Sequence, residues 1–375
     1  MLQLAGIEYD LFETQRFQHG IELAQTAPNL SLYDAIVSVG GDGVLHEVVN
    51  GSLTREDWKE VIKVPFGILP AGSANGVAVT LGFSDFHLAS LNIIRGNTQK
   101  YDIAALYCTN RGDEITYSVL DAVNGYFSDV DDTADEFRWM GPLRLTVAAV
   151  VRSIFLKKYR TRIYYLPDDT NIDNYTVIKD KESPASLESG SKERFLKPGP
   201  KPSIPNVIKG YNCVTDPISE RLSESWNVVD GAFGVTTITN VPFLTKDFRI
   251  SGTASTSNGT LSLVHESKRL SAFGFLDALL KETSDPTKGE FVSNMKETLV
   301  HCVIIESLGL ITKDKPANPN AGPSPHSQII ENRLVSWNPT APGTFRVDGE
   351  VLKGTTAIQV QVLPGLINFI CPNWL

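Results

Sequence analysis

Two glycine-rich segments hold residue types that suit phosphate chemistry. The first is Gly40-Gly41-Asp42-Gly43, and the second runs from Gly72 to Gly76. Glycines let a backbone turn sharply and approach a ligand, so that N–H groups can point at phosphate oxygens. A bare phosphate would repel Asp42, so its carboxylate suits a cation, or a hydroxyl whose proton it accepts. A Gly-Asp-Gly turn also commonly serves as an Asx-turn or helix cap. The local pattern leaves base and cap open.

Each glycine-rich segment stands between a predicted strand and a predicted helix. Residues 36–39 are mostly β-branched and apolar, and apolar residues then recur at helical spacing over residues 45–49. Residues 64–69 and 77–81 repeat the arrangement. Two such units in succession predict neighbouring parallel strands whose carboxyl ends face one cleft, where α/β sheets bind ligands. Neither segment matches the P-loop or the dinucleotide fingerprint GxGxxG, which weakens the usual NTPase and dehydrogenase interpretations.

Further charged residues lie farther along the chain. An acidic cluster contains Asp129, Asp131, Asp132 and Asp135. It could bind calcium or magnesium, but it lacks the glycine and final Glu of an EF-hand loop. The simpler interpretation is a solvated turn leading into a helix. Arg138 and Arg144 could reach a phosphate together only if the chain is redirected between them, at Gly141-Pro142.

The local pattern alone does not assign a function to two further polar motifs. Asp348-Gly349-Glu350 is typical of a hairpin turn. His46 and Glu47 follow the first glycine turn on the predicted helix, where a lone histidine is more often a surface residue than a ligand.

Size and composition limit the class of protein. The chain has 375 residues, 42% hydrophobic and 21% charged, with a formal net charge of −9. These values are typical of a soluble globular protein and argue against nucleic acid as a partner. No apolar run approaches the roughly 20 residues that span a bilayer. The cysteines, Cys108, Cys213, Cys302 and Cys371, are scattered, which favours reduced thiols in a cytoplasmic protein.

The pattern of elements changes near residue 99. We expect an α/β domain over residues 1–99, with a first strand at 7–12, and a mostly antiparallel β domain over residues 100–375. One long helix is expected over residues 138–156. Residues 168–225 and 313–327 are rich in Pro, Ser, Lys and acids, which predicts flexible insertions.

The motifs resemble a known family. Residues 38–51 and 69–75 closely resemble the catalytic domain shared by diacylglycerol and sphingosine kinases. Residues 125–131, 137–144 and 343–350 are more particular and narrow the resemblance to sphingosine kinases, and residues 13–19 look like the family's segment beside the nucleotide. The resemblance implies an α/β nucleotide-binding domain followed by a β-sandwich lipid-binding domain.

The resemblance also implies roles for individual residues. Asp42 would be the general base that deprotonates the primary hydroxyl of a sphingoid base, and Asp131 would hold the lipid head group. Gly40, Gly41 and Gly43 would line the substrate. ATP, used with Mg²⁺, would contact Thr14, Gln15, Arg16, Phe17, Gln18, Glu47, Gly72, Ser73, Ala74, Arg138, Arg144, Asp348, Gly349 and Glu350. A cytoplasmic enzyme of this kind would associate peripherally with membranes to reach its lipid.

Two departures from the family pattern bear on activity. Ala74 stands where the family usually has glycine, and a methyl group there could crowd a phosphate. The family's first strand and its Asn-Pro-x-Gly-Gly loop are expected before residue 1. The chain is therefore either the truncated or misassigned form of a longer kinase or a poorly active remnant. The alternatives are a ceramide or diacylglycerol kinase of the same fold and a non-catalytic lipid-binding relic; Asp131 argues against the first, because a carboxylate suits a free amine.

Overall fold

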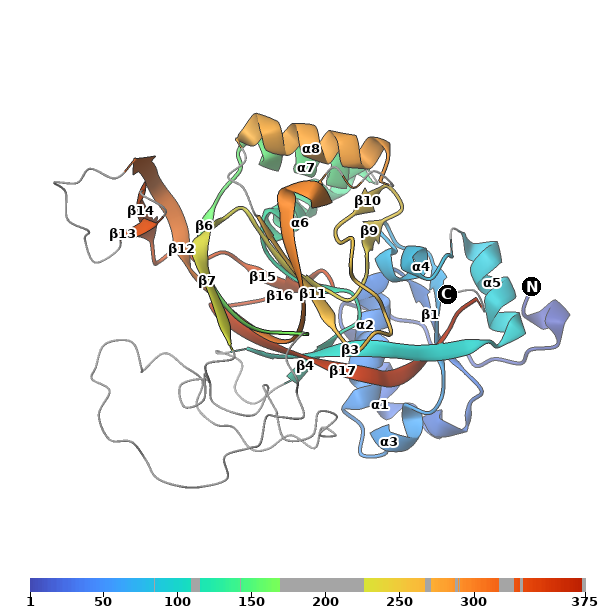
Figure 1. The fold of residues 1–375 in the computed structure, drawn as a ribbon. Coiled ribbons are helices and arrows are strands. Elements are labelled where there is room, and N and C mark those ends of the chain that lie inside the picture. The colour runs from blue at the N-terminus through green and yellow to red at the C-terminus, as the bar shows by residue number, and fades with distance from the viewer. Residues whose placement is uncertain are drawn as a thin grey trace, which may run out of the picture.

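The computed structural model describes residues 1–83, 85–108, 115–141, 143–168, 226–266, 271–286, 289, 291–316, 327–330 and 333–372. Figure 1 shows the N-terminal elements gathered at one end of the molecule and a large sheet at the other.

The N-terminal part has α/β architecture. Strands β1 (Ile36–Gly40) and β2 (Phe66–Pro70) are parallel, with Ile36 opposite Phe66 and Gly40 opposite Pro70. Leu45 of the following helix and Ile68 of β2 are both fully buried, because the apolar faces of helix and sheet pack together. The helices are α1 (His19–Thr26), α2 (Asp42–Leu53), α3 (Trp58–Val61), α4 (Gly76–Thr80) and α5 (Phe86–Arg95), with short 3₁₀ turns η1 (Gln3–Ala5) and η2 (Leu30–Leu32).

The C-terminal part is a large, mostly antiparallel sheet that folds over on itself. Its inner faces pack together in one apolar cluster that includes Leu106, Ile163, Leu263, Val303 and Val360. The strands are β3 (Thr98–Cys108), β4 (Ile115–Ser118), β5 (Asp121–Gly125), β6 (Tyr159–Pro167), β7 (Asn227–Phe233), β8 (Val235–Thr239), β11 (Leu261–Glu266), β12 (Met295–Pro316), β13 (Ser327–Ile330), β14 (Arg333–Asn338), β15 (Phe345–Val347), β16 (Glu350–Leu352) and β17 (Ala357–Ile370), with β9 (Phe243–Thr245) and β10 (Phe248–Arg249) as a separate pair.

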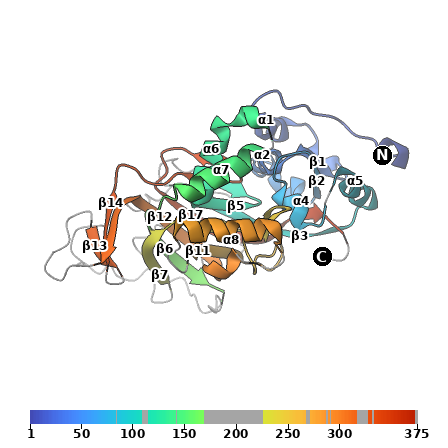
Figure 2. The same ribbon diagram turned by 90° about the horizontal axis from the view of Figure 1, so that it is seen from above.

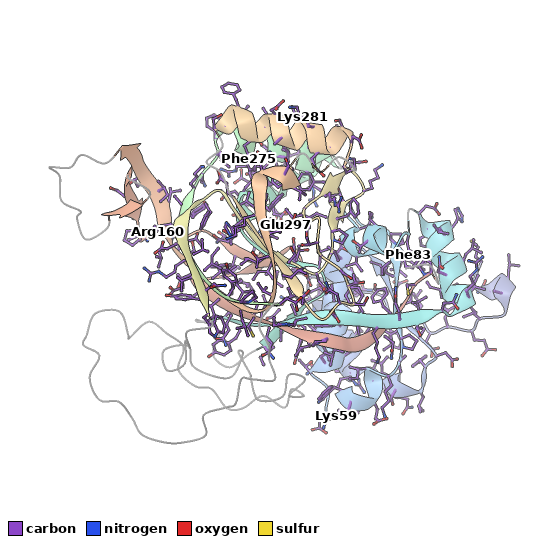
Figure 3. All side chains as sticks on the ribbon, in the orientation of Figure 1. Lys59, Phe83, Arg160, Phe275, Lys281 and Glu297 are labelled. Atoms are coloured by element: carbon purple, nitrogen blue, oxygen red, sulfur yellow. The ribbon has the colours of Figure 1, made fainter. Side chains whose placement is uncertain are left out.

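Three helices lie against this sheet. They are α6 (Tyr126–Glu136), α7 (Leu143–Ile154) and α8 (Ala272–Ser284), with 3₁₀ turns η3 (Arg138–Met140) and η7 (Val292–Asn294). Figure 2 shows α7 and α8 side by side. Phe275 of α8 is fully buried in an aromatic cluster with Tyr126 and Phe291, whereas Lys281 lies on the outer side of the helix (Figure 3).

The last strand joins the two parts. β17 pairs along most of its length with β3, and Phe369 near its end pairs in parallel with Phe66 of β2. Tyr101, Ile103 and Phe369 are fully buried in the same apolar cluster as Leu45 and Ile68. The core of the α/β part is therefore completed by residues that follow position 99 and by the C-terminal strand.

The predicted fold class is confirmed, and several details differ. Residues 7–12 form no strand and are mostly exposed. The predicted helix over residues 138–156 is divided into η3 and α7, with Gly141 between them at φ +60°. Of the residues predicted as flexible insertions, 313–316 continue β12 and Ser327 begins β13, while residues 169–225 and 317–326 lie outside the described part of the chain.

Two predictions from composition can also be compared with the structure. The sequence favoured reduced cysteines; Cys108, Cys302 and Cys371 are buried thiols, and Cys213 lies outside the described residues. Among the described residues, no helix is long and apolar enough to cross a membrane.

Candidate active site

The two glycine loops touch each other. Ala71 N–H donates to the carbonyl of Gly40 at 2.9 Å, extending the pairing of β1 and β2 beyond the strands. A Cβ added at Gly72 would lie only 2.3 Å from Gly41 Cα, so neither backbone leaves room for a side chain at Gly72. Their contact confirms that the loops lie at one edge of the sheet.

Asp42 ties one loop to the other. It is the first residue of α2, yet its carboxylate accepts hydrogen bonds from Gly76 N–H at 2.9 Å and Val77 N–H at 3.0 Å, at the start of α4. Burial raises the pKa of Asp42 from 3.8 to about 6, despite these bonds and with a contribution from the charge of Asp348. Asp42 is therefore a cap, but of the neighbouring loop's helix and not its own. Its raised pKa also suits a general base near neutral pH.

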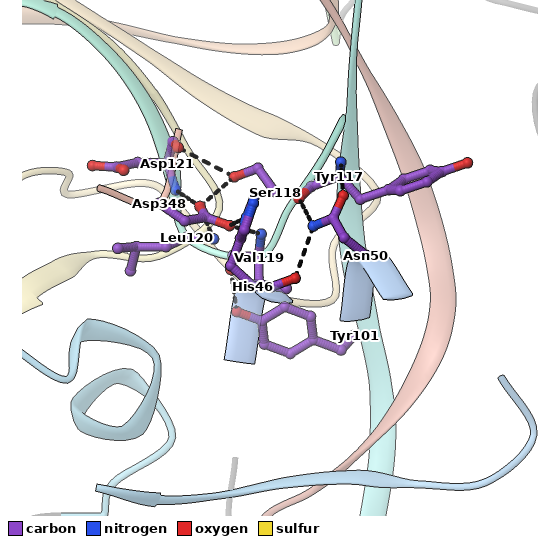
Figure 4. Close-up of polar contacts among 9 residues, drawn as sticks. All are labelled: His46, Asn50, Tyr101, Tyr117, Ser118, Val119, Leu120, Asp121 and Asp348. Carbon is purple, nitrogen blue, oxygen red and sulfur yellow. Dashed lines mark hydrogen bonds and ion pairs between the residues drawn. The ribbon is translucent and has the colours of Figure 1, made fainter. Parts of the chain in front are cut away.

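Asp348 is the centre of a hydrogen-bond network (Figure 4). It occupies the predicted hairpin turn between β15 and β16, at φ +48° and followed by Gly349 at φ +86°. Its carboxylate accepts bonds from Ser118 Oγ and from three successive backbone N–H groups, and it lies 2.8 Å from His46 Nδ1; the backbone donors are Val119, Leu120 and Asp121. The carboxylate thus connects α2 to the β4–β5 turn, which makes it a structural anchor.

Asp131 lies on α6 near two arginines. Burial raises the pKa of Asp131 to about 6, and the nearby charges of Arg346 and Arg144 partly oppose that shift. Arg346, on β15, donates to Asp132 at 2.6 Å and to Asp135 at 3.4 Å. The acidic cluster is therefore divided: two of its acids pair with Arg346, while Asp129 bonds with Tyr159.

Glu47 positions the segment at residues 14–18. Its carboxylate accepts bonds from Gln18 N–H at 3.0 Å and from Gly20 N–H at 2.7 Å, at the start of α1. Residues 14–18 are exposed beside α2, and Arg16 forms an ion pair with Glu22. The predicted nucleotide-lining residues of this region are thus brought together, with Glu47 holding the backbone in place.

The remaining residues predicted to contact the nucleotide lie mainly in the second glycine loop and the β15–β16 turn. Gly72 and Ser73 are exposed, and Ala74 is not among the residues with positive φ, so its methyl group costs no backbone strain. Glu350 lies near Gly43, with its Oε1 3.9 Å from the position of an added Cβ. Burial raises the pKa of Glu350. Arg138 belongs to η3, and the placement of its side chain is not described.

One buried acid in this region was missed by the sequence analysis. Asp121, at the start of β5, is only 7% exposed. Burial raises its pKa well above the usual range, and the charges of Asp348, Asp131 and Asp42 add to the shift. The charges of Asp42 and Asp131 therefore both act on the Asp121 carboxyl group. We call the region where α2, the β4–β5 turn, the β15–β16 turn and α6 meet the junction.

The fold and the paired glycine loops define a diacylglycerol-kinase type of catalytic domain. A family model described as the diacylglycerol kinase catalytic domain matches residues 1–106. Two solved structures from Bacillus anthracis str. Sterne, described as a putative diacylglycerol kinase and a diacylglycerol kinase, share the fold, with TM-scores of 0.54 and 0.56. Both are 14% identical to this chain; they cover 100% and 99% of it, and it covers 90% and 88% of theirs.

Relatives found by sequence comparison identify the family within this class. The chain is 33% identical over 382 residues to Sphingosine kinase 1 of Arabidopsis thaliana, which covers 98% of this chain and 70% of that protein. It is 37% identical over 215 residues to Sphingosine kinase 2 of Homo sapiens, covering 54% of this chain and 31% of that protein. The chain belongs to the sphingosine kinase family.

Proposed function

We propose that this protein transfers the γ-phosphate of ATP to the primary hydroxyl of a sphingoid base such as sphingosine, dihydrosphingosine or phytosphingosine. The lipid oxygen forms a bond to the γ-phosphorus, the bond from that phosphorus to the β–γ bridging oxygen breaks, and ADP leaves. The hydroxyl proton passes to the carboxylate of Asp42. The observation that carries the proposal is the position of Asp42 where the two glycine loops meet, with a pKa raised to about 6.

The bonds of Asp42 are compatible with this role. Each carboxylate oxygen accepts one backbone N–H from the start of α4, and each keeps a further lone pair. The two N–H bonds fix the orientation of the carboxylate before the substrate arrives. At pH 7 and above, a group with a pKa of about 6 is mostly ionised and ready to accept a proton.

The nucleotide is proposed to lie along the glycine loops, between residues 14–18 and the β15–β16 turn. Gly72 and Ser73 are exposed and Ala74 is partly exposed, and Arg144 offers positive charge near Asp131. Glu47 and Asp348 contribute by holding these segments in place, since backbone N–H groups occupy their carboxylates. Glu350, half-buried beside Gly43, is the freer acid of the turn.

Family membership implies a divalent cation in addition to ATP, and Mg²⁺ is our proposal for its identity. Within the described part of the chain, no group of three His, Cys, Asp or Glu residues could hold a metal ion. The residues present therefore do not form a protein cage for Mg²⁺, and we derive no step through it.

A charged head group fits the junction better than a neutral one. Asp42, Asp121 and Asp131 all have raised pKa values because they are buried. The ammonium of a sphingoid base would compensate part of this negative charge, whereas ceramide and diacylglycerol carry no positive charge. This difference favours a sphingoid base over both.

The substitution Asp42→Asn tests the proposal. Removing the base is expected to lower kcat by about 10²–10⁴-fold, the range for general-base catalysis, while circular dichroism shows an intact fold. Asp34→Asn, which removes an exposed acid just before β1, is the control. Turnover of sphingosine with radiolabelled ATP, compared across phytosphingosine, ceramide and diacylglycerol, is the measurement. Unchanged turnover in Asp42→Asn would remove Asp42 as the base.

We also propose that the protein takes its lipid from a membrane surface. Large apolar side chains are exposed on η3, α7 and α8, namely Trp139 at 81%, Leu143 at 65% and Phe273 at 85%. α7 contacts both η3 and α8, so the three side chains stand on neighbouring elements. Since the proposed substrate resides in a bilayer, that region suits contact with lipid.

Vesicle binding tests the membrane proposal. Trp139→Ser and Phe273→Ser are expected to lower sedimentation with phosphatidylcholine vesicles while leaving turnover of detergent-dispersed sphingosine unchanged. Phe86→Ser, at a phenylalanine 44% exposed on α5, is the matched control. Equal vesicle binding by all three variants and the unsubstituted protein would contradict the proposal.

A further inference from the structure

Asp121 projects from the sheet on the same side as Arg346. Asp348 N–H donates to the carbonyl of Asp121 at 2.9 Å, and Arg346 pairs with Val123 across β5 and β15. Because side chains alternate along a strand, Asp121, Val123 and Arg346 share one face. Ala122 and Val347 point the other way, into the apolar interior of the folded sheet.

Helix α6 lies over the face that carries Asp121. The Arg346 guanidinium reaches Asp132 and Asp135 of α6, so this helix is held against that face by hydrogen-bonded ion pairs. Asp131 belongs to the same helix, and its charge acts on Asp121. On the other side, the Asp348 carboxylate joins Asp121 N–H to His46, which lies one helical turn after Asp42 on α2. Asp121 thus lies on the face that is covered by the helix carrying Asp131, and its backbone is linked through Asp348 to the helix carrying Asp42.

The Asp121 side chain has no polar partner among the described residues. Figure 4 shows its carboxylate directed away from Asp348, with no hydrogen bond drawn to it. Arg346 is engaged by Asp132, Asp135 and the Gly349 carbonyl. Asp121 as a residue is only 7% exposed, and a largely buried carboxylate without a partner destabilises a fold; such groups are typical of functional sites.

We propose that Asp121 is a substrate-binding residue that holds the ammonium of the sphingoid base together with Asp131, while the primary hydroxyl faces Asp42. This inference rests on the proposed function. An ammonium has three N–H donors and one positive charge, so it can serve two carboxylates at once. An N-acylated lipid has one N–H and no charge, and would leave the charges of both acids uncompensated. Asp121 therefore makes the enzyme selective for a free amine.

Asp121→Asn tests the assignment because it preserves shape and removes charge. One charge-assisted contact is expected to account for about a 10–100-fold rise in the KM for sphingosine, with a much smaller change in kcat. The Kd for sphingosine without ATP, measured by tryptophan fluorescence, is expected to rise equally. The KM for N-acetylsphingosine is expected to stay the same or fall, so that selectivity for the free amine is lost.

The melting temperature distinguishes a binding role for Asp121 from a purely structural one. Removing a structural carboxylate would lower it. Asp121 has a raised pKa, so its ionised form destabilises the folded state at neutral pH. Asp121→Asn is expected to raise the melting temperature at pH 7.5 while it weakens sphingosine binding. Asp129→Asn is the matched control, because Asp129 is equally buried but bonded to Tyr159. It is expected to leave selectivity unchanged.

A second variant, Asp121→Ala, removes the carboxylate without placing an amide in the junction, and the same loss of selectivity is expected. If both variants bind and phosphorylate sphingosine like the unsubstituted protein, while Asp131→Asn raises the KM, the assignment of Asp121 is wrong and the proposed function stands. A parallel rise in KM for sphingosine and N-acetylsphingosine would also overturn it. If the unsubstituted protein neither binds nor phosphorylates any sphingoid base, the proposed function itself fails.

Discussion

Burial of carboxylates dominates the chemistry of single residues in this protein. Asp42 and Asp131 both have pKa values raised to about 6, and burial is the largest cause in each case. Both must be ionised in the proposed reaction, one to accept a proton and the other to bind an ammonium. Catalytic activity should therefore depend on pH through the ionisation of both carboxylates.

We predict that kcat/KM for sphingosine falls steeply below pH 6. Because Asp42 and Asp131 are protonated in the same range, these two groups give the logarithm of kcat/KM a slope of at least two against pH. In Asp131→Asn one titrating group is removed, so the slope should fall by one, and the KM for sphingosine should rise more than that for ATP. A pH-rate profile of both proteins is the measurement. Identical slopes in the two would contradict the role of Asp131.

The stability of the folded protein should rise as the pH falls below 6, whereas kcat/KM falls. An acid with a raised folded-state pKa binds its proton more readily when folded, so unfolding is opposed as the pH falls from about 6 to about 4. For Asp42 the shift from 3.8 to about 6 corresponds to roughly 3 kcal/mol of destabilisation when the group is ionised. The contributions of Asp42 and Asp131 should raise the melting temperature at pH 5 relative to pH 7, and Asp131→Asn should reduce this rise.

Local sequence was sufficient to find some of these residues and not others. Asp42 could be identified because glycines surround it and an apolar strand precedes it. Asp121 has no such signal: it stands in the run Ser118-Val-Leu-Asp-Ala, which looks like an ordinary strand end. Its significance depends on pairing with β15 and on coverage by α6, and neither contact can be derived from neighbouring residues.

At the scale of elements, turns and caps connect segments that are distant in sequence. Asp42 caps α4, Glu47 caps the start of α1, and Asp348 collects three N–H groups of the β4–β5 turn. In each case a carboxylate from one loop stabilises the backbone of another. The active-site loops are therefore fixed by side-chain bonds as well as by the sheet.

We predict that the two acids of the β15–β16 turn have different functions. Asp348→Asn replaces an acceptor of five bonds with a group that has one acceptor oxygen, so it should destabilise the protein by about 2–4 kcal/mol. Glu350→Gln, two residues on, removes a half-buried acid whose ionisation is disfavoured. It should maintain or raise stability and alter the KM for ATP. Urea unfolding and ATP kinetics of both variants decide this; equal stability would show that Asp348 is no anchor.

Element boundaries were predictable where turn residues mark them. Asp348-Gly349 indicated the hairpin, whereas the single helix expected over residues 138–156 is divided at Gly141 into η3 and α7. The strand predicted at residues 7–12 is absent, because its alternating apolar residues find no partner strand and Leu11 remains 68% exposed. Alternation alone does not make a strand without a neighbour to pair with.

At the scale of the whole molecule, the two parts of the chain share one core. Composition placed a boundary near residue 99, because the character of the sequence changes from α/β to antiparallel there. The return of the C-terminal strand to β2 could not be predicted, since residues 366–371 read as an ordinary strand of the second part. Phe369 packs on Tyr101 with ring centroids 5.2 Å apart, and both lie in the cluster that contains Leu45.

This shared core predicts that the α/β part and the large sheet unfold together. Phe369→Ala removes a fully buried ring that contacts both parts, so it should cost about 3–5 kcal/mol, the usual range for a buried phenylalanine. Calorimetry should show one transition that moves to lower temperature as a whole. Phe86→Ala, at an exposed phenylalanine of α5, should change the melting temperature little. If Phe369→Ala instead splits the transition into two, with only the first shifted, the α/β part folds independently and its contact with β17 is peripheral. A single shifted transition would mean that the loops carrying Asp42 depend for their stability on the last strand of the described chain.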